Sequence, residues 1–267
     1  MSRFDFEFIL NAYDSQTSFL RKISKFYSHS LKENSRALKY VTGTSSWPDE
    51  RGISPEMISK FQIGYAGESK DLLEFVSLNN LNEEYLYTTG IFSVINETVY
   101  DSFYDRIIFP LHDARGFVIG FSGRVWKKGD VRKKFINTST TTLFSKSLNL
   151  YGLHLAIDNI VKKRQVFVVE GVPDVIACHQ AGILNVVAPC GTAITKYQLL
   201  ILKSIADLVV FVLDNDNAGE TALKRAQEIC KEEKIKNTSI SLQKYKDADE
   251  ILHLLDAKSL QEAFTLS

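Results

Sequence analysis

The hydrophobic pattern in the second half of the chain changes repeatedly between short apolar runs and segments with helical spacing. Apolar runs occupy residues 166–169, 186–188 and 208–213, and in the stretch that follows each of them apolar residues recur every three or four positions. A fourth strand is expected at residues 238–243. Continuous apolar strands that alternate with helices are typical of a parallel sheet covered by helices. We therefore predict an α/β domain over residues 161–267.

The first part of the chain shows a helical pattern. Phe19, Ile23, Phe26 and Tyr27 recur at helical spacing. After the turn-rich stretch GTSSWPDERG, the segment SPEMISKF begins a second short helix, with Pro55 at its first position. These features predict a helical lead-in that extends to about residue 70.

A strand–turn–strand pattern follows between residues 100 and 150. The apolar runs RIIFPLH and FVIGFSGR flank the tetrapeptide DARG, in which Asp113 and Gly116 suit a tight turn. We predict a hairpin here and assign residues 1–160 to a first, mixed α+β domain.

Carboxylates follow three of the expected strands. Glu170 ends the first, Asp214 and Asp216 end the third, and Asp247 and Asp249 follow the fourth. The carboxyl ends of parallel strands meet at one edge of a sheet, where ligands bind. Crowded carboxylates repel one another unless a cation neutralises them, and hard oxygen ligands favour Mg²⁺ or Mn²⁺. The pattern predicts a metal site built without histidine.

Helix capping is the competing explanation for each acid taken singly. Asp174 follows Pro173 in the first turn of a helix, where any carboxylate is stabilised by the helix dipole. Asn217 with Glu220, and Asp247 with Glu250, have the spacing of capping boxes. Caps do not explain the second aspartate of each pair or a glutamate at the end of an apolar strand. The acids together therefore favour a metal site.

Charge is balanced overall but uneven along the chain. The net charge is +0, yet between Arg124 and Arg164 ten Lys or Arg residues stand against two Asp residues. Such a basic stretch can hold polyphosphate, and a solvated surface loop is the alternative. By contrast, residues 81–105 contain acids and no basic residue.

Composition and targeting signals narrow the class of protein. With 45% hydrophobic and 24% charged residues, the chain has the composition of a soluble globular protein. It shows neither a signal peptide nor a run of about 18 apolar residues, so we expect a cytoplasmic protein without a membrane partner. Cys178, Cys190 and Cys230 form no C-x-x-C pair and are expected to be buried free thiols.

The motifs around the acids resemble a known domain. VVEGVPDVIACHQAG, APCGTAIT, VLDNDNAGETALKRA and DADEIL, in this order, resemble the TOPRIM domain of bacterial primases, topoisomerases and some nucleases. Earlier segments, ERGISPEMISKFQIGYAG, RIIFPLHDARGFVIGFSGR and KKFINTSTTTLFSKSLNLYGL, resemble the amino-terminal part of the RNA polymerase domain of DnaG-type primases. The resemblance covers roughly residues 50–255. It implies a TOPRIM parallel sheet flanked by helices, preceded by a mixed α+β primase-type subdomain.

The resemblance also implies roles for individual residues. Glu170, Asp214 and Asp216 match catalytic residues of the family. The metal-binding acids that it implies are Glu170, Asp174, Asp214, Asp216, Asp247 and Asp249. The residues that it implies for nucleic acid or nucleotide are Arg51, Lys60, Arg124, Lys134, Asn137 and Lys146. Lys60 stands at a position where we expect arginine in the family.

The implied activity is synthesis of short RNA primers on single-stranded DNA from ribonucleoside triphosphates. A metal-dependent TOPRIM nuclease and a non-catalytic module that binds single-stranded DNA or a helicase remain alternatives. A topoisomerase would need a tyrosine on a further large domain. Neither the zinc-binding nor the helicase-binding domain of DnaG-type primases is found in the sequence. We therefore expect a phage or mobile-element version or a fragment, and a zinc-binding domain or replicative helicase that acts in trans.

Overall fold

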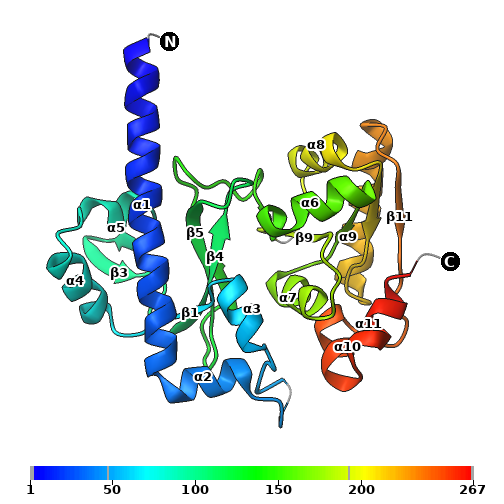
Figure 1. Cartoon of the computed structure of the whole chain (residues 1–267), viewed down its shortest axis with the longest axis horizontal. Helices are drawn as coiled ribbons and strands as arrows, with labels where there is room; N and C mark the ends of the chain where they lie inside the picture. Colours follow the sequence, from blue (N-terminus) through cyan, green and yellow to red (C-terminus); the bar gives the residue numbers. More distant parts are fainter. Residues whose placement is uncertain (1–2, 47, 192, 266–267) are drawn as a thin grey trace. The chain divides into compact units, whose positions relative to one another are not determined.

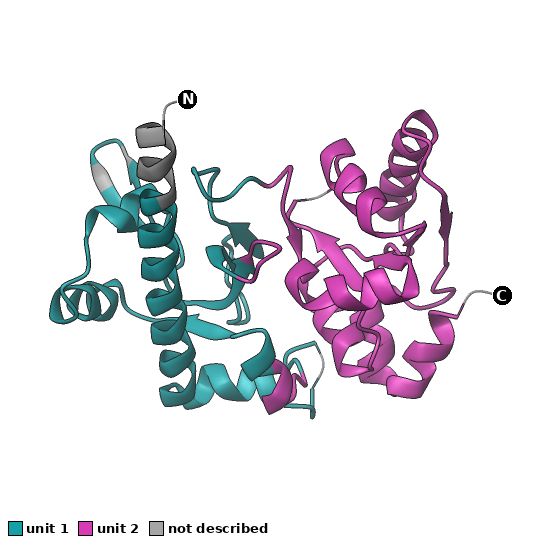
Figure 2. Ribbon diagram, turned by 45° about the horizontal axis from the view of Figure 1, so that its top comes forward, with its two compact units in different colours: residues 1–51, 58–111, 117–145 teal, residues 52–57, 112–116, 146–267 magenta. Residues whose placement is uncertain are grey.

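The computed structural model describes residues 3–46, 48–191 and 193–265. Trp47, in the segment GTSSWPDERG, and Thr192, in the segment APCGTAIT, lie outside the described residues. The described chain forms two compact units (Figures 1 and 2). Unit 1 comprises residues 1–51, 58–111 and 117–145, and unit 2 comprises residues 52–57, 112–116 and 146–267.

Unit 1 is built on a four-stranded sheet beside a long helix. The strands β1 (Gly64–Ala66), β4 (Arg106–His112), β5 (Val118–Arg124) and β6 (Phe135–Asn137) lie in the order β1-β4-β5-β6. Helix α1 (Arg3–Glu33) packs against β1 and β5. A Cβ at Gly64 would lie 2.6 Å from the Tyr27 backbone, so only glycine allows this close approach.

The remaining elements of unit 1 are short. Helix α2 (Ser35–Thr42) follows α1. Helix α3 (Pro55–Lys60), whose first three residues group with unit 2, starts at Pro55 as predicted. Helices α4 (Ser69–Leu78) and α5 (Glu84–Thr88) precede a two-stranded sheet of β2 (Phe92–Ile95) and β3 (Thr98–Asp101). The predicted hairpin of β4 and β5 is confirmed, and its turn is closed by a hydrogen bond from the Gly116 amide to the Asp113 carbonyl of 3.0 Å.

Unit 2 is a five-stranded sheet in the order β11-β10-β8-β9-β7. Its parallel strands are β8 (Gln165–Val168), β9 (Val186–Pro189), β10 (Leu208–Phe211) and β11 (Asn237–Ser239). The short edge strand β7 (Leu150–Tyr151) pairs antiparallel with β9. The predicted parallel sheet is therefore confirmed, with one antiparallel edge strand added.

Helices separate the strands of unit 2 in sequence. They are α6 (Leu153–Lys163), α7 (Val172–Gln180), α8 (Lys196–Ile205), α9 (Asn217–Glu232), α10 (Ala248–Leu254) and α11 (Ala257–Ala263). Val166, Val209 and Phe211 of the strands are fully buried together with Leu199 and Leu202 of α8. All three cysteines are free and buried, as predicted.

Residues 146–160 group with unit 2, because β7 pairs with β9 and α6 packs on β8 and β9. Residues 52–57 group with it because Gln180 holds their backbone: its side chain accepts from the Ser54 amide and donates to the Gly52 carbonyl. The division into domains at residues 160 and 161 stays a prediction. In the described residues, no helix combines the length and apolar content needed to cross a bilayer.

Candidate acidic site and basic pocket

The predicted acids gather at the carboxyl-terminal edge of the unit 2 sheet. We call this set the acidic edge, and it consists of Glu170, Asp174, Asp214, Asp216, Asp247 and Asp249. Glu170 lies two residues beyond β8, and its Oε1 accepts a hydrogen bond of 3.1 Å from the Asp214 amide. Asp214 lies three residues beyond β10. The rule for parallel sheets thus brings residues 44 positions apart into direct contact.

Helix α9 begins directly against this contact. A Cβ at Gly219 would lie 2.0 Å from the Asp214 carbonyl oxygen and 3.1 Å from Glu170 Oε1, so no other residue fits without a shift of the backbone. Asp216 caps α9, with Oδ1 accepting from the amides of Ala218 and Gly219 at 2.9 Å each. The alternative that Asn217 caps this helix does not apply, because the cap is one residue earlier.

The other acids lie on α7 and α10. Asp174 is buried, and it accepts hydrogen bonds from the Gly171 amide at 3.2 Å and from the Asp249 amide at 3.4 Å. Asp247 caps α10, as the capping alternative had it, with Oδ1 accepting from the Glu250 amide at 2.8 Å. Asp249 is buried, and its Oδ1 lies 3.4 Å from His253 Nδ1.

Burial and mutual repulsion raise the pKa values of this group. Burial and the neighbouring Asp214 raise the pKa of Glu170. Burial, with Asp247, Asp249 and Asp214 nearby, raises the pKa of Asp174 well above its usual range. The pKa values of Asp214 and Asp247 are also raised, in both cases mainly by burial. The acidic edge therefore favours protons or cations more strongly than isolated carboxyl groups do.

A lysine stands among these acids. Lys246 Nζ lies 3.4 Å from Asp214 Oδ2 and 3.9 Å from Asp247 Oδ2. Over the described part of the chain, no three His, Cys, Asp or Glu side chains converge closely enough to hold a metal ion together. The donor set nevertheless suits a hard divalent ion: it is made of carboxylates, and Asp214 and Asp247 lie close enough to share one cation.

Unit 1 contains a pocket of about 670 Å³ that is rich in basic side chains. We call it the basic pocket. It is lined by Arg36, Lys39, Tyr40, Ser46, Pro48, Asp49, Glu50, Arg124, Val125, Trp126, Lys127, Lys128 and Lys134. Six of these residues are basic and two are acidic, so the pocket is positive overall. The rings of Tyr40 and Trp126 lie in the pocket with their centroids 6.0 Å apart.

The predicted residue Arg124 is held firmly in this pocket. Its side chain is buried, its Nε donates to the Tyr40 hydroxyl at 2.8 Å, and its guanidinium lies over the Phe135 ring. Lys134 is exposed and lines the same pocket, and its carbonyl accepts from the Val125 amide. The structure therefore brings Arg124 and Lys134 together in one pocket.

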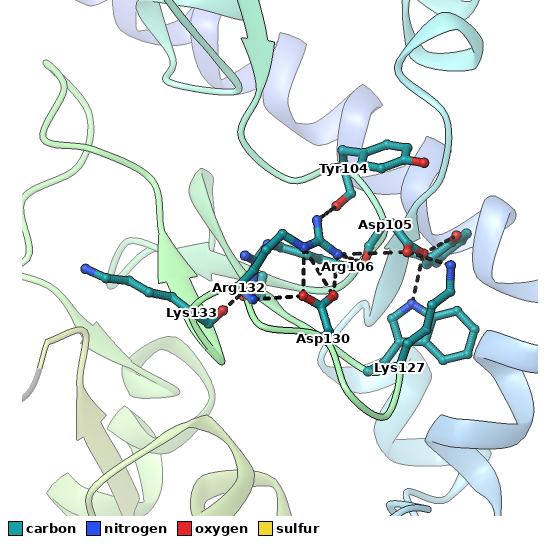
Figure 3. A network of polar contacts seen from close by, with 10 residues as sticks. Tyr104, Asp105, Arg106, Lys127, Asp130, Arg132 and Lys133 are labelled. Atoms are coloured by element: carbon teal, nitrogen blue, oxygen red, sulfur yellow. Dashed lines mark hydrogen bonds and ion pairs between the residues drawn. The ribbon is translucent and has the colours of Figure 1, made fainter. Parts of the chain in front are cut away.

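The loop that carries the pocket lysines is fixed by a buried carboxylate (Figure 3). Asp105 forms an ion pair of 2.6 Å with Lys127 and accepts hydrogen bonds from the Tyr65 hydroxyl and the Trp126 indole. In the same loop, Asp130 pairs with Arg132, which holds the pKa of Asp130 down to about 2. At least this part of the basic stretch is thus a folded structure, not a freely solvated loop.

The other predicted binding residues are not among those that line the basic pocket. Arg51 is buried at the start of the segment that leads to α3, Lys60 lies in the last turn of α3, and Asn137 is paired with Ser122 on β6 and β5. Lys146 belongs to unit 2, where its carbonyl accepts from the Gln198 side chain.

Several residues of these sites were not predicted from the sequence: Lys246, Gly219, Asp105, Tyr40 and Trp126. A local signal existed for Lys246, since it directly precedes Asp247-Ala248-Asp249. Asp105, Tyr40 and Trp126 contact residues that are distant in the sequence, so no local pattern marks them. Gly219 is required by the close packing of α9 against the loop at Asp214.

Family models match most of the chain. Residues 26–157 match the DNA primase catalytic core, N-terminal domain, and residues 167–252 match a Toprim-like domain. A DNA primase of Lactococcus lactis is 43% identical over 192 residues, which are 72% of this chain and 29% of that protein. A DNA primase of Clostridium acetobutylicum is 37% identical over 253 residues, 94% of this chain and 40% of that protein. The chain thus spans well under half the length of these curated relatives.

Solved structures agree with these matches. The Aquifex aeolicus primase, solved with its zinc-binding and RNA polymerase domains, superposes with a TM-score of 0.84 and 33% identity over 93% of this chain and 60% of that chain. A DNA primase domain from Pseudomonas aeruginosa gives a TM-score of 0.83 and 30% identity over 94% and 78% of the two chains. A DnaG primase catalytic domain bound to single-stranded DNA gives 0.82 and 29%, over 95% and 79%.

Proposed function

This chain belongs to the family of DnaG-type primase catalytic cores, and we propose that it synthesises short RNA primers on single-stranded DNA by metal-dependent nucleotidyl transfer. The family is generally metal-dependent. The observation that carries the proposal for this chain is the contact between Glu170 and Asp214, which joins the ends of β8 and β10 in one acidic edge.

Within the acidic edge, we assign the metal to Asp214, Asp216 and Asp247, with Glu170, Asp174 and Asp249 beside them. Mg²⁺ or Mn²⁺ bound there would neutralise charge on the transferring phosphoryl group. Glu170 is the candidate proton acceptor for the attacking hydroxyl. One of its oxygens is engaged with the Asp214 amide, its other oxygen is available, and its raised pKa brings it closer to neutral pH, where a base acts best.

The basic pocket of unit 1 is assigned to phosphate groups of template or nucleotide. Arg124 and Lys134 supply positive charge, and the partly exposed ring of Trp126, next to the ring of Tyr40, offers a stacking surface for a base. Such a combination holds single strands without reading their sequence. We assign Arg51, Lys60, Asn137 and Lys146 to the same task. We further propose that the substrates are ribonucleoside triphosphates and that the protein acts in the cytoplasm. Its proposed partner is a zinc-binding domain or a replicative helicase that acts in trans.

One assay tests the proposed function. The protein is incubated with single-stranded templates, Mg²⁺ or Mn²⁺ and labelled ribonucleotides, and the products are separated on a denaturing gel. Labelled oligomers that require both template and metal support the proposal. A shortened template with no labelled product would indicate a nuclease, and binding without either product would indicate a non-catalytic module.

A further inference from the structure

The segment between β11 and α10 places a lysine at the acidic edge. Lys246 Nζ lies within 4 Å of both Asp214 Oδ2 and Asp247 Oδ2, at 3.4 and 3.9 Å. These two carboxylates come from different connections of the sheet, one after β10 and one at the start of α10. A single ammonium group is therefore shared by two acids that would otherwise repel each other.

The backbone of Lys246 is fixed on both sides. Its amide donates to Glu250 Oε2 at 2.6 Å, and its carbonyl accepts from the Asn215 amide at 3.0 Å. Asn215 lies between Asp214 and Asp216, so this hydrogen bond ties the loop after β10 to the residue that precedes Asp247. The position from which the lysine side chain starts is thus set by the same loops that carry the acids.

We infer that Lys246 is the built-in counter-ion of the acidic edge, which bridges Asp214 and Asp247 until a divalent cation takes the same oxygens. Two cations cannot share these oxygens at short range, so binding of the metal releases the lysine. Lys246 is in this sense a positioning residue: it keeps the carboxylates close together in the metal-free protein and competes with the metal. The inference rests on the proposed function, because it takes the acidic edge to be the metal site.

A simple exposed ion pair is the alternative, since the Lys246 side chain is 56% exposed. Lys244 provides a matched control two residues away. It is also exposed, but its ammonium lies over the Tyr245 ring, 5.2 Å from the centroid. A general effect of removing positive charge from this segment would appear at both positions, whereas the counter-ion acts only at Lys246.

The test compares the full chain with K246M, K246R, K244M and D214N. Mn²⁺ affinity is measured from the electron paramagnetic resonance signal of free Mn²⁺, and melting temperature is measured in chelator. We expect K246M to bind Mn²⁺ about two- to fivefold more tightly and to melt roughly 1–3 °C lower without metal. K246R and K244M should resemble the parent in both measurements.

Two outcomes would overturn the inference. The first is a K246M variant whose Mn²⁺ affinity equals or falls below that of the parent. The second is a K246R variant that behaves like K246M. That result would show that side-chain packing rather than charge at position 246 sets the Mn²⁺ affinity. The D214N variant distinguishes a wrong role for Lys246 from a wrong assignment of the metal site. If D214N binds Mn²⁺ as well as the parent, the acidic edge is not the metal site; if D214N binds weakly while K246M is unchanged, only the role of Lys246 is wrong.

Discussion

Glu170 and Asp214 are joined by a hydrogen bond of 3.1 Å from the Asp214 amide to Glu170 Oε1. The bond connects the loop that follows β8 with the loop that follows β10. It directs one oxygen of Glu170 to the backbone. Burial, together with the nearby Asp214 carboxylate, raises the pKa of Glu170.

Glu170→Gln should abolish primer synthesis and leave the fold intact. The amide oxygen of glutamine can still accept from Asp214, but the amide cannot take a proton. Loss of a general base costs about 10²–10⁴-fold in rate. Primer synthesis and melting temperature are measured together, with Glu220→Gln, an exposed acid in the first turn of α9, as the control. A Glu170→Gln variant that extends primers at the parental rate would remove Glu170 from the catalytic assignment.

Gly219→Ala should damage the acidic edge through the backbone. The new methyl group would lie 2.0 Å from the Asp214 carbonyl oxygen, so either the loop or the start of α9 must move. Overpacking of this kind costs about 1–3 kcal/mol. Urea unfolding should show this loss, and Mn²⁺ affinity should fall with it. The control is Gly191→Ala, where an added Cβ meets nothing within 4 Å. Equal stability of the two variants would contradict the prediction.

Lys134→Ala should weaken binding of single-stranded DNA and flatten its salt dependence. Each phosphate contact that is lost lowers the slope of log affinity against log salt by about 0.7. Fluorescence anisotropy of a labelled oligonucleotide over a series of salt concentrations measures this slope. Lys162→Ala on α6, outside the basic pocket, is the matched control. If both variants keep the parental slope, Lys134 belongs to a solvated surface.

His154 should make the stability of unit 2 sensitive to acid. Its ring stacks on His112 with centroids 4.1 Å apart, and burial lowers the pKa of His154 to about 4, although Asp113 nearby opposes this shift. The unfolded chain takes up a proton near pH 6.5 and the folded chain only near pH 4, so stability falls as pH drops through this window. The loss amounts to about 1.4 kcal/mol per pH unit at most.

The comparison for His154 is with His154→Phe, which keeps an aromatic ring but cannot be protonated. Urea unfolding at pH 7.5, 6 and 5 gives the free energy of unfolding of both proteins. We expect the parent to lose stability relative to the variant as the pH falls. A constant difference between the two proteins would show that His154 is protonated equally in the folded and unfolded states.

Patterns that depend on neighbours in the sequence were predicted well. The parallel strands, the Asp113–Gly116 turn and the start of α3 at Pro55 are all confirmed, and Asp247 caps α10 as the alternative to a metal ligand had it. Each follows from local chemistry: apolar runs, glycine in a turn, proline at a helix start, and an aspartate before a helix. The position of acids after strands then placed the acidic edge, because parallel strands end at the same edge.

Elements held by distant contacts could not be predicted in this way. The short strand β7 forms because it pairs with β9. Strand β1 likewise forms by pairing with β4, whose residues are about forty positions away in the sequence. The two-stranded sheet of β2 and β3 and the helix α6 were also absent from the prediction. Short strands have too few residues to show a period, so their partners decide their structure.

The sequence by itself determined which residues are candidates for the chemistry, and the tertiary structure decided how they are held. Glu170, Asp214 and Asp247 could be named from their positions after strands. That Lys246 stands between two of them, that only glycine fits at position 219, and that Asp105 fixes the loop of the basic pocket depend on atoms brought together by folding. The physical reason is range: propensity and periodicity act over a few residues, whereas ion pairs and close packing act between any residues that the fold makes adjacent.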